Sequence, residues 1–138
     1  MINFLRQFAV ILPIFLLLDG IWLGVISKGF YLNRMRSFAR ISDGSFAPVW
    51  GSVFLVYLLL SFGVLFLVLP QAEGSWLKAL LFGGALGLVA YGVYDLTNHA
   101  LVKDWSVTLT LVDIAWGVFV CGATSALTTA VLKSLNWV

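Results

Sequence analysis

The chain has 138 residues, of which 62% are hydrophobic and 10% are charged, and its mean hydropathy is +1.05. Soluble domains carry about 25% charged residues, so this composition excludes an ordinary soluble domain. The formal net charge is only +2, and we expect no nucleic-acid partner. The composition indicates an integral membrane protein whose main surroundings are the lipid bilayer.

Four apolar runs are long enough to cross a bilayer as helices. A membrane-spanning helix needs about 20 mostly apolar residues, and such runs lie near residues 7–26, 48–69, 78–99 and 106–132. Basic and turn-forming residues flank them, as is typical of helix ends at a membrane surface. The sequence therefore predicts an all-α integral membrane protein, a bundle of four transmembrane helices in one domain (1–138) without a soluble module.

The first run, 7–26, contains Asp19 within the stretch LLLDGIWLGV. A charged side chain at the centre of a membrane helix costs about 2.5 to 3.5 kcal/mol, so Asp19 must turn inward, pair, or hold a proton. Asp19 also interrupts the apolar region that a signal peptide needs. No clear cleavage pattern follows, and we expect this helix to remain in the mature protein.

The connection 27–47 concentrates positive charge. It carries one acid, Asp43, and four basic residues: Lys28, Arg34, Arg36 and Arg40. Basic residues in short loops resist translocation, so we place this loop in the cytoplasm and both termini outside. The same charges attract anionic lipid headgroups by on the order of 1 kcal/mol each. A specific phosphate site is the alternative interpretation of this loop.

The second run, 48–69, offers Tyr57 and Ser61, whereas the third ends in AYGVYDLTNHA. The last turns of this third run hold five candidate site residues: Tyr91, Tyr94, Asp95, Asn98 and His99. His99 could relay protons, ligate a metal together with Asp95, or cap the helix. Because the chain has no second histidine and no cofactor motif, we predict neither a metal site nor a cofactor.

The fourth run, 106–132, repeats the D-x-x-W pattern of the first run as Asp113 and Trp116. Side chains three residues apart share a helix face. We therefore expect each aspartate to have an indole from its own helix beside it, Trp22 for Asp19 and Trp116 for Asp113. These two tryptophans should report directly on their aspartates.

Small and hydroxyl residues follow one side of each of the last two runs. Gly84 and Gly87 precede the aromatic and acidic end of the third run, and Gly117, Cys121 and Thr124 follow Asp113 in the fourth. Such residues are typical of contacts between membrane helices. Cys121 is the only cysteine, so an internal disulfide is impossible, and we interpret it as a packing residue.

Depth in the membrane brings the acids together. Asp19 lies seven residues before the predicted end of its helix, and Asp113 lies seven after the start of its own. At 1.5 Å per residue both lie roughly 10 Å inside the membrane from the same side, and Asp95 falls in or near the same layer. Burial and mutual repulsion favour protonated carboxyls, so we expect this layer to hold at least one proton near neutral pH.

The stretch AYGVYDLTNHALVKDWSVTLTLVDIAWG, preceded by DGIWLG, FYL and a proline opening the second helix, resembles a family of small bacterial inner-membrane proteins. That family is known only as a domain of unknown function. The resemblance covers nearly the whole chain and implies four transmembrane helices in a bacterial cytoplasmic membrane. It implies no reaction. The matched positions are expected to form a site: Asp19, Trp22, Tyr94, Asp95, Thr97, Asn98, Asp113, Trp116 and Gly117.

Two classes of function fit these residues. The first is a binding or transport protein whose acidic pocket takes a cation or protons, because aromatic faces attract positive charge by roughly 0.5 to 2 kcal/mol each. A chain this small would need a second copy to form two gates, which predicts a homo-oligomer. The aromatic residues of this pocket would be Trp22, Trp116, Tyr91 and Tyr94.

The second class is a membrane enzyme that acts on a lipid or isoprenoid, with one aspartate as general acid and another as base. No nucleophile, metal or nucleotide motif supports it, so whether the chain is an enzyme stays open. A third interpretation is an assembly subunit whose acids pair with a larger membrane partner. In the simplest alternative, Asp113 only accepts a hydrogen bond across a helix contact and stabilises the bundle.

Overall fold

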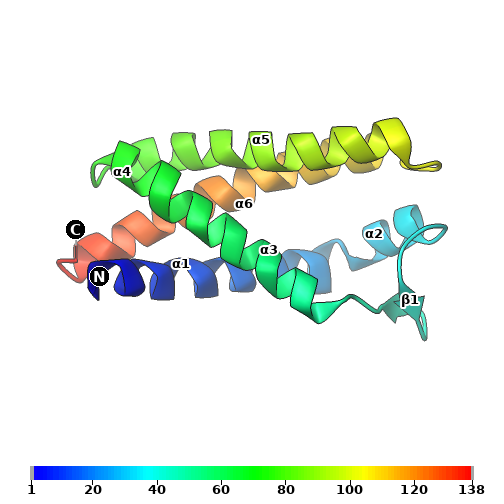
Figure 1. The fold of residues 1–138 in the computed structure, drawn as a ribbon, viewed down its shortest axis with the longest axis horizontal. Coiled ribbons are helices and arrows are strands. Elements are labelled where there is room, and N and C mark those ends of the chain that lie inside the picture. The colour runs from blue at the N-terminus through cyan, green and yellow to red at the C-terminus, as the bar shows by residue number, and fades with distance from the viewer. Residues whose placement is uncertain (1, 138) are drawn as a thin grey trace.

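In a computed structural model, which describes residues 2–137, the chain forms a bundle of long helices with both termini at one end (Figure 1). Four helical segments are long and apolar enough to span a membrane: Asn3–Ile26, Trp50–Ala72, Trp76–Leu101 and Val107–Ser134. The predicted bundle of four transmembrane helices is therefore confirmed. Large apolar side chains are widely exposed along these helices, as expected for surfaces that face lipid.

The first span consists of α1 (Ile2–Ile21) and a π-helical turn, η1 (Trp22–Ile26). At its end the amide and the hydroxyl of Ser27 both donate to the carbonyl of Trp22, at 2.8 and 2.7 Å. A π-turn adds one residue to a helical turn and changes the direction of the side chains around it. It begins here at a tryptophan that sequence analysis placed in the site.

The second span joins α3 (Trp50–Gly63), a π-turn η2 (Val64–Val68) and α4 (Leu69–Ala72). Pro70 lies in the first turn of α4, and a proline lacks the amide hydrogen that the preceding helical turn would bond. This explains why the helix changes its pitch just before Pro70. Because proline is tolerated in the first turn of a helix, the span continues to Ala72, beyond the predicted end at residue 69.

The basic connection contains more structure than the predicted loop. It forms a short helix, α2 (Lys28–Met35), and a small hairpin of β1 (Ile41–Ser42) and β2 (Ser45–Phe46). Asp43 and Gly44 form its turn with φ of 50° and 72°. Two positive φ angles in a two-residue turn suit the twist of a hairpin, and an Asp-Gly pair favours them.

The long helices α5 (Trp76–Leu101) and α6 (Val107–Ser134) are antiparallel and make the most extensive contact in the protein. Ser75 and Ser106 cap their first turns through their hydroxyl oxygens. The two backbones touch closely at Gly87, where a Cβ atom would lie 2.1 Å from the carbonyl oxygen of Gly117. Glycine is therefore required there, as the small-residue pattern predicts.

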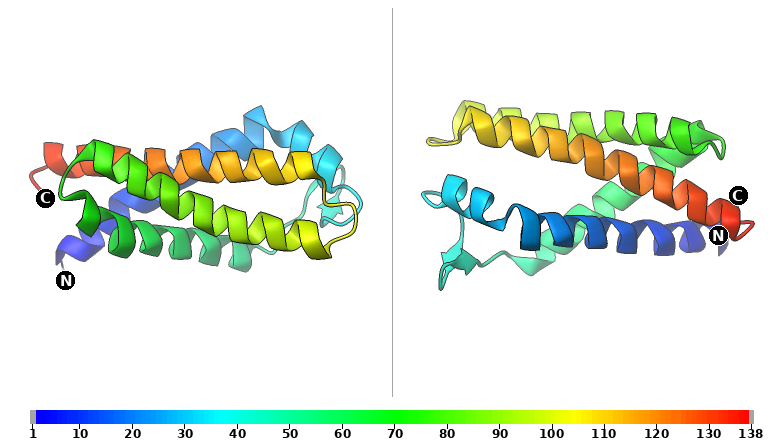
Figure 2. Two further views of the ribbon diagram at one scale, coloured as in Figure 1. Left: turned by 90° about the horizontal axis from the view of Figure 1, so that it is seen from above. Right: turned by 180° about the vertical axis from the view of Figure 1, so that it is seen from behind.

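The other two spans complete the bundle unevenly. α1 packs on α6 and on α3, and α4 and η2 pack on α5 (Figure 2). Gly63, the last residue of α3, contacts Leu86 of α5. From there α3 crosses the front of the bundle and diverges from α5 toward the end that carries α2 (Figure 1). The bundle is thus tightly packed at the end with the termini and wider at the end with the basic segment.

Two clusters of buried side chains fill the bundle. One, around Ile11, Phe15 and Val120, occupies the middle and the end with the termini. The other, around Tyr31, Trp105 and Leu109, lies beneath α2 and the hairpin. The acidic side chains lie between these two clusters.

Candidate functional site

Asp19 on α1 is one of two buried carboxyl side chains among residues 2–137, with 6% of its surface exposed. It accepts hydrogen bonds from the phenol of Tyr57 on α3, at 2.7 Å, and from the indole Nε1 of Trp116 on α6, at 2.6 Å. Both carboxylate oxygens therefore have a donor. These bonds tie three helices together at one point within the membrane.

The three aspartates Asp19, Asp95 and Asp113 are together called the acidic layer. Asp113 on α6 is its second member. It accepts a hydrogen bond of 2.6 Å from the phenol of Tyr31 on α2, which in turn accepts one of 3.4 Å from the indole of Trp22. Burial and the neighbouring Asp113 carboxylate raise the pKa of the Tyr31 phenol above its usual range, so it keeps its proton and acts as the donor. The basic segment is thereby anchored to the acidic layer.

Neither indole donates a hydrogen bond to the aspartate of its own helix, beside which the sequence places it. Trp116 donates to Asp19 on another helix, and Trp22 reaches Asp113 only through Tyr31. The rings of Trp22 and Trp116 are stacked, with centroids 4.4 Å apart and an angle of 7° between planes. This stacking between two helices fixes the exchanged arrangement.

Asp95 on α5 differs from the other two acids. Its side chain is completely buried, and neither carboxyl oxygen has a hydrogen-bond donor among residues 2–137. The carboxyl of Asp113 is its neighbour, and the two can bond only if one of them holds a proton. A buried ionised carboxylate without donor or cation is strongly unfavourable. The arrangement therefore fits a proton shared by Asp95 and Asp113.

Several weaker acids surround this layer. Tyr91 and Cys121 lie near Asp19, and Tyr94 lies near Asp95 and Asp113. Tyr91 is packed against Gly117, where an added Cβ would lie 2.2 Å from the ring. In the part of the chain that the structure describes, no lysine, arginine or histidine forms an ion pair with any of the three aspartates.

Two residues predicted for the site, Asn98 and His99, direct polar atoms to backbone carbonyls. Asn98 donates to the carbonyl of Tyr94 in its own helix, at 3.0 Å. A ring nitrogen of His99 lies 3.0 Å from the carbonyl oxygen of Trp105. Tyr94 is 53% exposed and meets the Trp105 ring edge-on. Asn98 and His99 thus bond to backbone carbonyls at the end of α5.

Sequence analysis missed Tyr31 and Tyr57, the two phenols that bond to the acids. Tyr57 was noted only as a feature of the second run, yet a tyrosine in mid-membrane needs a partner for its hydroxyl. A search for donors at the depth of Asp19 would have selected it. Tyr31 carries no such signal, because only the folding of α2 back toward the bundle brings a loop residue to Asp113.

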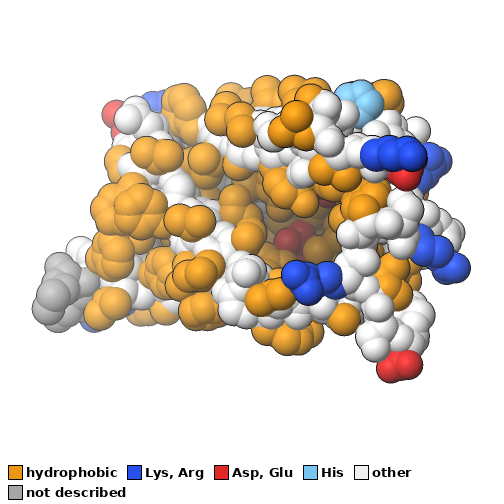
Figure 3. Space-filling view, turned by 45° about the vertical axis from the view of Figure 1, so that its right-hand side comes forward, with side chains coloured by type: hydrophobic (Ala, Val, Ile, Leu, Met, Phe, Trp, Pro, Cys, Tyr) orange, Lys and Arg blue, Asp and Glu red, His pale blue; other side chains and the backbone are white. Residues whose placement is uncertain are grey.

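The acidic layer borders a hollow in the side of the bundle. Figure 3 shows this hollow at the end of the basic segment, with acidic side chains at its bottom and apolar side chains around much of its edge. Lys and Arg side chains stand nearby. Asp113 is partly accessible, whereas Asp95 is completely covered. A ligand could therefore reach the layer through Asp113.

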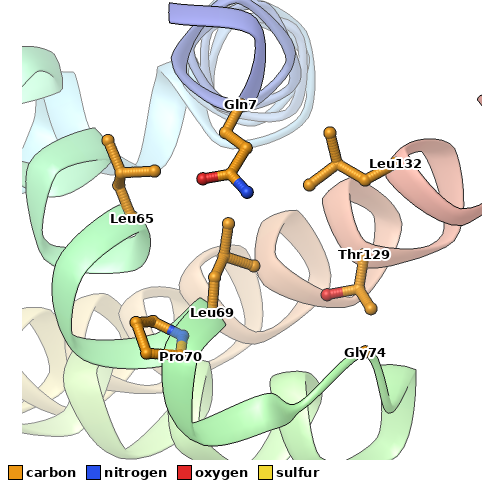
Figure 4. A pocket seen from close by; sticks show the side chains of 7 residues that line it. All are labelled: Gln7, Leu65, Leu69, Pro70, Gly74, Thr129 and Leu132. Atoms are coloured by element: carbon orange, nitrogen blue, oxygen red, sulfur yellow. The ribbon is translucent and has the colours of Figure 1, made fainter. Parts of the chain in front are cut away.

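A separate cavity of about 150 Å³ lies at the opposite end of the molecule, near the termini (Figure 4). The amide of Gln7 points into it, and the other residues around it are mainly apolar. None of its lining residues is charged. This cavity lacks the chemistry of the acidic layer, which we retain as the candidate site.

Comparison with known proteins identifies a family. Residues 4–130 match the family described as "Predicted membrane protein (DUF2177)". The resemblance seen in the sequence to a membrane family of unknown function is thereby confirmed. No curated protein and no solved structure matches the chain.

Proposed function

The chain belongs to this family of membrane proteins, and we propose that its acidic layer binds protons and an organic cation in competition for the same carboxylates. The observation that carries the proposal is the environment of Asp95. It is completely buried, has no donor among the described residues, and faces Asp113. A proton or a bound cation would lower the negative charge of such a pair, and no basic residue among residues 2–137 forms an ion pair with it.

The aromatic residues support an organic cation over a metal ion. The Trp22–Trp116 stack and two phenols surround the carboxyl groups, and aromatic faces attract ammonium groups. A metal ion instead needs several oxygen, nitrogen or sulfur ligands that converge on one point. Within residues 2–137, no group of three or more His, Cys, Asp or Glu side chains has that arrangement.

We further propose that the protein lies in a bacterial cytoplasmic membrane with its basic segment in the cytoplasm. The family match supports a membrane location, and the charges of residues 27–47 support this orientation. The acidic layer then lies about 10 Å below the cytoplasmic surface, since Asp19 is seven residues from the end of its span at Ile26. Transport of the cation or of protons would start from this side.

A pH titration of the purified protein, followed by tryptophan fluorescence, tests the proton site. Trp116 bonds directly to Asp19 and stacks on Trp22, which is linked to Asp113 through Tyr31. A proton gained by Asp19 or by Asp113 therefore changes the environment of both rings. We expect a transition between about pH 5 and pH 8 that moves in Asp113→Asn and in Asp95→Asn, because the acids titrate as a coupled group.

Two controls locate the signal. Trp116→Phe should lose most of the transition, whereas Trp76→Phe should retain it, because Trp76 is exposed at the far end of α5. A flat curve for the wild-type protein across this pH range would contradict the proposal. The three aspartates would then be structural, as in the interpretation of the chain as an assembly subunit.

A further inference from the structure

The acidic layer is closed along the axis of the bundle. On the side of the basic segment it is covered by Tyr31, Trp105 and Leu109, all at least 93% buried, with further aromatic rings packed against them. On the other side, Ile11, Phe15 and Val64 are completely buried. An ion that approaches along this axis would have to displace one of these apolar clusters to reach Asp113.

The layer is open toward the side of the bundle. α3 contacts α5 at Gly63 and Leu86, and its ribbon then diverges from that of α5 toward the end that carries α2 (Figure 1). Figure 3 shows the hollow at this end of the molecule, with acidic side chains visible at its bottom. Its surroundings are parts of membrane-spanning helices whose apolar side chains are exposed to lipid.

From this geometry we infer that the ligand is an amphipathic amine, a cationic nitrogen on a hydrocarbon chain, which enters from the bilayer between α3 and α5. The amine would bind Asp113 at the bottom of the hollow while its chain stays in lipid. Charge complementarity supports this occupant, since acidic side chains lie at the bottom of the hollow and apolar side chains around much of its edge. The inference rests on the proposed cation site and adds the class of ligand and its route.

The pairing of Asp95 with Asp113 gives this binding a defined proton balance. In this proposal the two carboxyls share one proton before the amine binds. When an ammonium group binds Asp113, the pair can release that proton to water and hold the cation instead, so net charge in the site is unchanged. Bound amine should therefore be released as the pH is lowered, because protons then compete for the carboxylates.

Native mass spectrometry from nanodiscs of phosphatidylglycerol, a lipid without an amine, tests the inference. The probe is dodecylamine, compared with propylamine, which lacks the chain, and dodecanol, which lacks the charge. We expect one dodecylamine per chain at neutral pH and its release at acidic pH, with neither propylamine nor dodecanol retained. The release of dodecylamine at acidic pH is measured on the wild-type protein, so a folding defect in a variant cannot cause it.

Variants then locate the amine. Asp113→Asn should reduce bound dodecylamine at least about tenfold, as expected when one member of a buried ion pair is removed. Glu73→Gln is the matched control, because Glu73 is fully exposed at the opposite end, beside Lys78. It should retain wild-type binding.

Three results would overturn the inference. Equal retention of propylamine would show aqueous access, equal retention of dodecanol would show that only the chain is recognised, and binding that survives Asp113→Asn would place the amine elsewhere. The tryptophan titration separates these failures from failure of the proton site. If the pH transition is present but dodecylamine does not bind, the proton site stands and the ligand class is wrong.

Discussion

The phenol of Tyr57 makes the most testable single contact in the site. Its hydrogen bond to Asp19 is 2.7 Å long and partly buried, and it joins α3 to α1 within the membrane. Hydrogen bonds to charged groups contribute about 1.5 to 3 kcal/mol, and neutral ones about 1 kcal/mol. The strength of this bond therefore depends on whether Asp19 is ionised.

We predict that Tyr57→Phe lowers the free energy of unfolding by about 1.5 to 3 kcal/mol if Asp19 is ionised, and by about 1 kcal/mol if it is protonated. Unfolding in mixed micelles, with Asp19→Asn and the double variant, gives the coupling energy between the two side chains. Tyr94→Phe is the control, since its ring is 53% exposed. Equal losses at Tyr57 and Tyr94 would show that the bond to Asp19 contributes little.

Contacts of this kind separate what the sequence predicts from what it does not. The depth of Asp19 and Asp113 follows from the helical rise and needs no tertiary information. The exchange of indoles does not follow, because it depends on stacking between rings on helices distant in sequence. Tyr31 is the extreme case, since its role requires the fold of a loop.

At the scale of elements, the contact between α5 and α6 depends on glycines at specific positions. A Cβ at Gly87 would lie 2.1 Å from the carbonyl oxygen of Gly117, which is a severe clash with backbone. A Cβ at Gly84, on the same helix, would lie 3.5 Å from Val118, an ordinary contact. Sequence analysis noted both glycines in one pattern and could not rank them.

We predict that Gly87→Ala destabilises the protein by at least about 2 kcal/mol, because the helices must separate to admit the methyl group. Gly84→Ala should change stability by less than about 1 kcal/mol, since the higher helix propensity of alanine offsets any crowding. Thermal unfolding in detergent measures both. If the two variants behave alike, the close approach of α5 and α6 is less important than the geometry indicates.

The boundaries of the helices are also predicted only in part by the sequence. Composition and run length predict four spans, but the second span continues through Pro70 to Ala72 because proline is tolerated in the first turn of α4. The helix α2 lies within a segment whose charges suggested only a loop. Its packing on Trp22 and Asp113 through Tyr31 supplies stability that local sequence does not show.

At the scale of the whole molecule, charge divides the ends of the bundle. Five of the eight basic residues lie at the end of α2 and the α5–α6 turn, namely Lys28, Arg34, Arg36, Arg40 and Lys103. The other three, Arg6, Lys78 and Lys133, lie at the opposite end, where Lys78 pairs with Glu73. Basic residues favour the cytoplasmic side, so this division predicts the orientation.

Cysteine labelling in intact bacterial cells tests the orientation. Cys121 is completely buried and can be replaced by alanine to give a background without cysteine. On that background we expect Ser42→Cys in the hairpin to react with a membrane-impermeant maleimide only after the cells are opened. Glu73→Cys, in the exposed turn at the other end, should react in intact cells.

The orientation decides which leaflet supplies the ligand. The hollow opens near the basic end, so a cytoplasmic hairpin means that an amphipathic amine enters from the inner leaflet, about 10 Å below its surface. The reverse labelling pattern would place the opening in the outer leaflet. Protons that compete for Asp95 and Asp113 would then come from outside the cell, and external acid, rather than cytoplasmic acid, would release the amine.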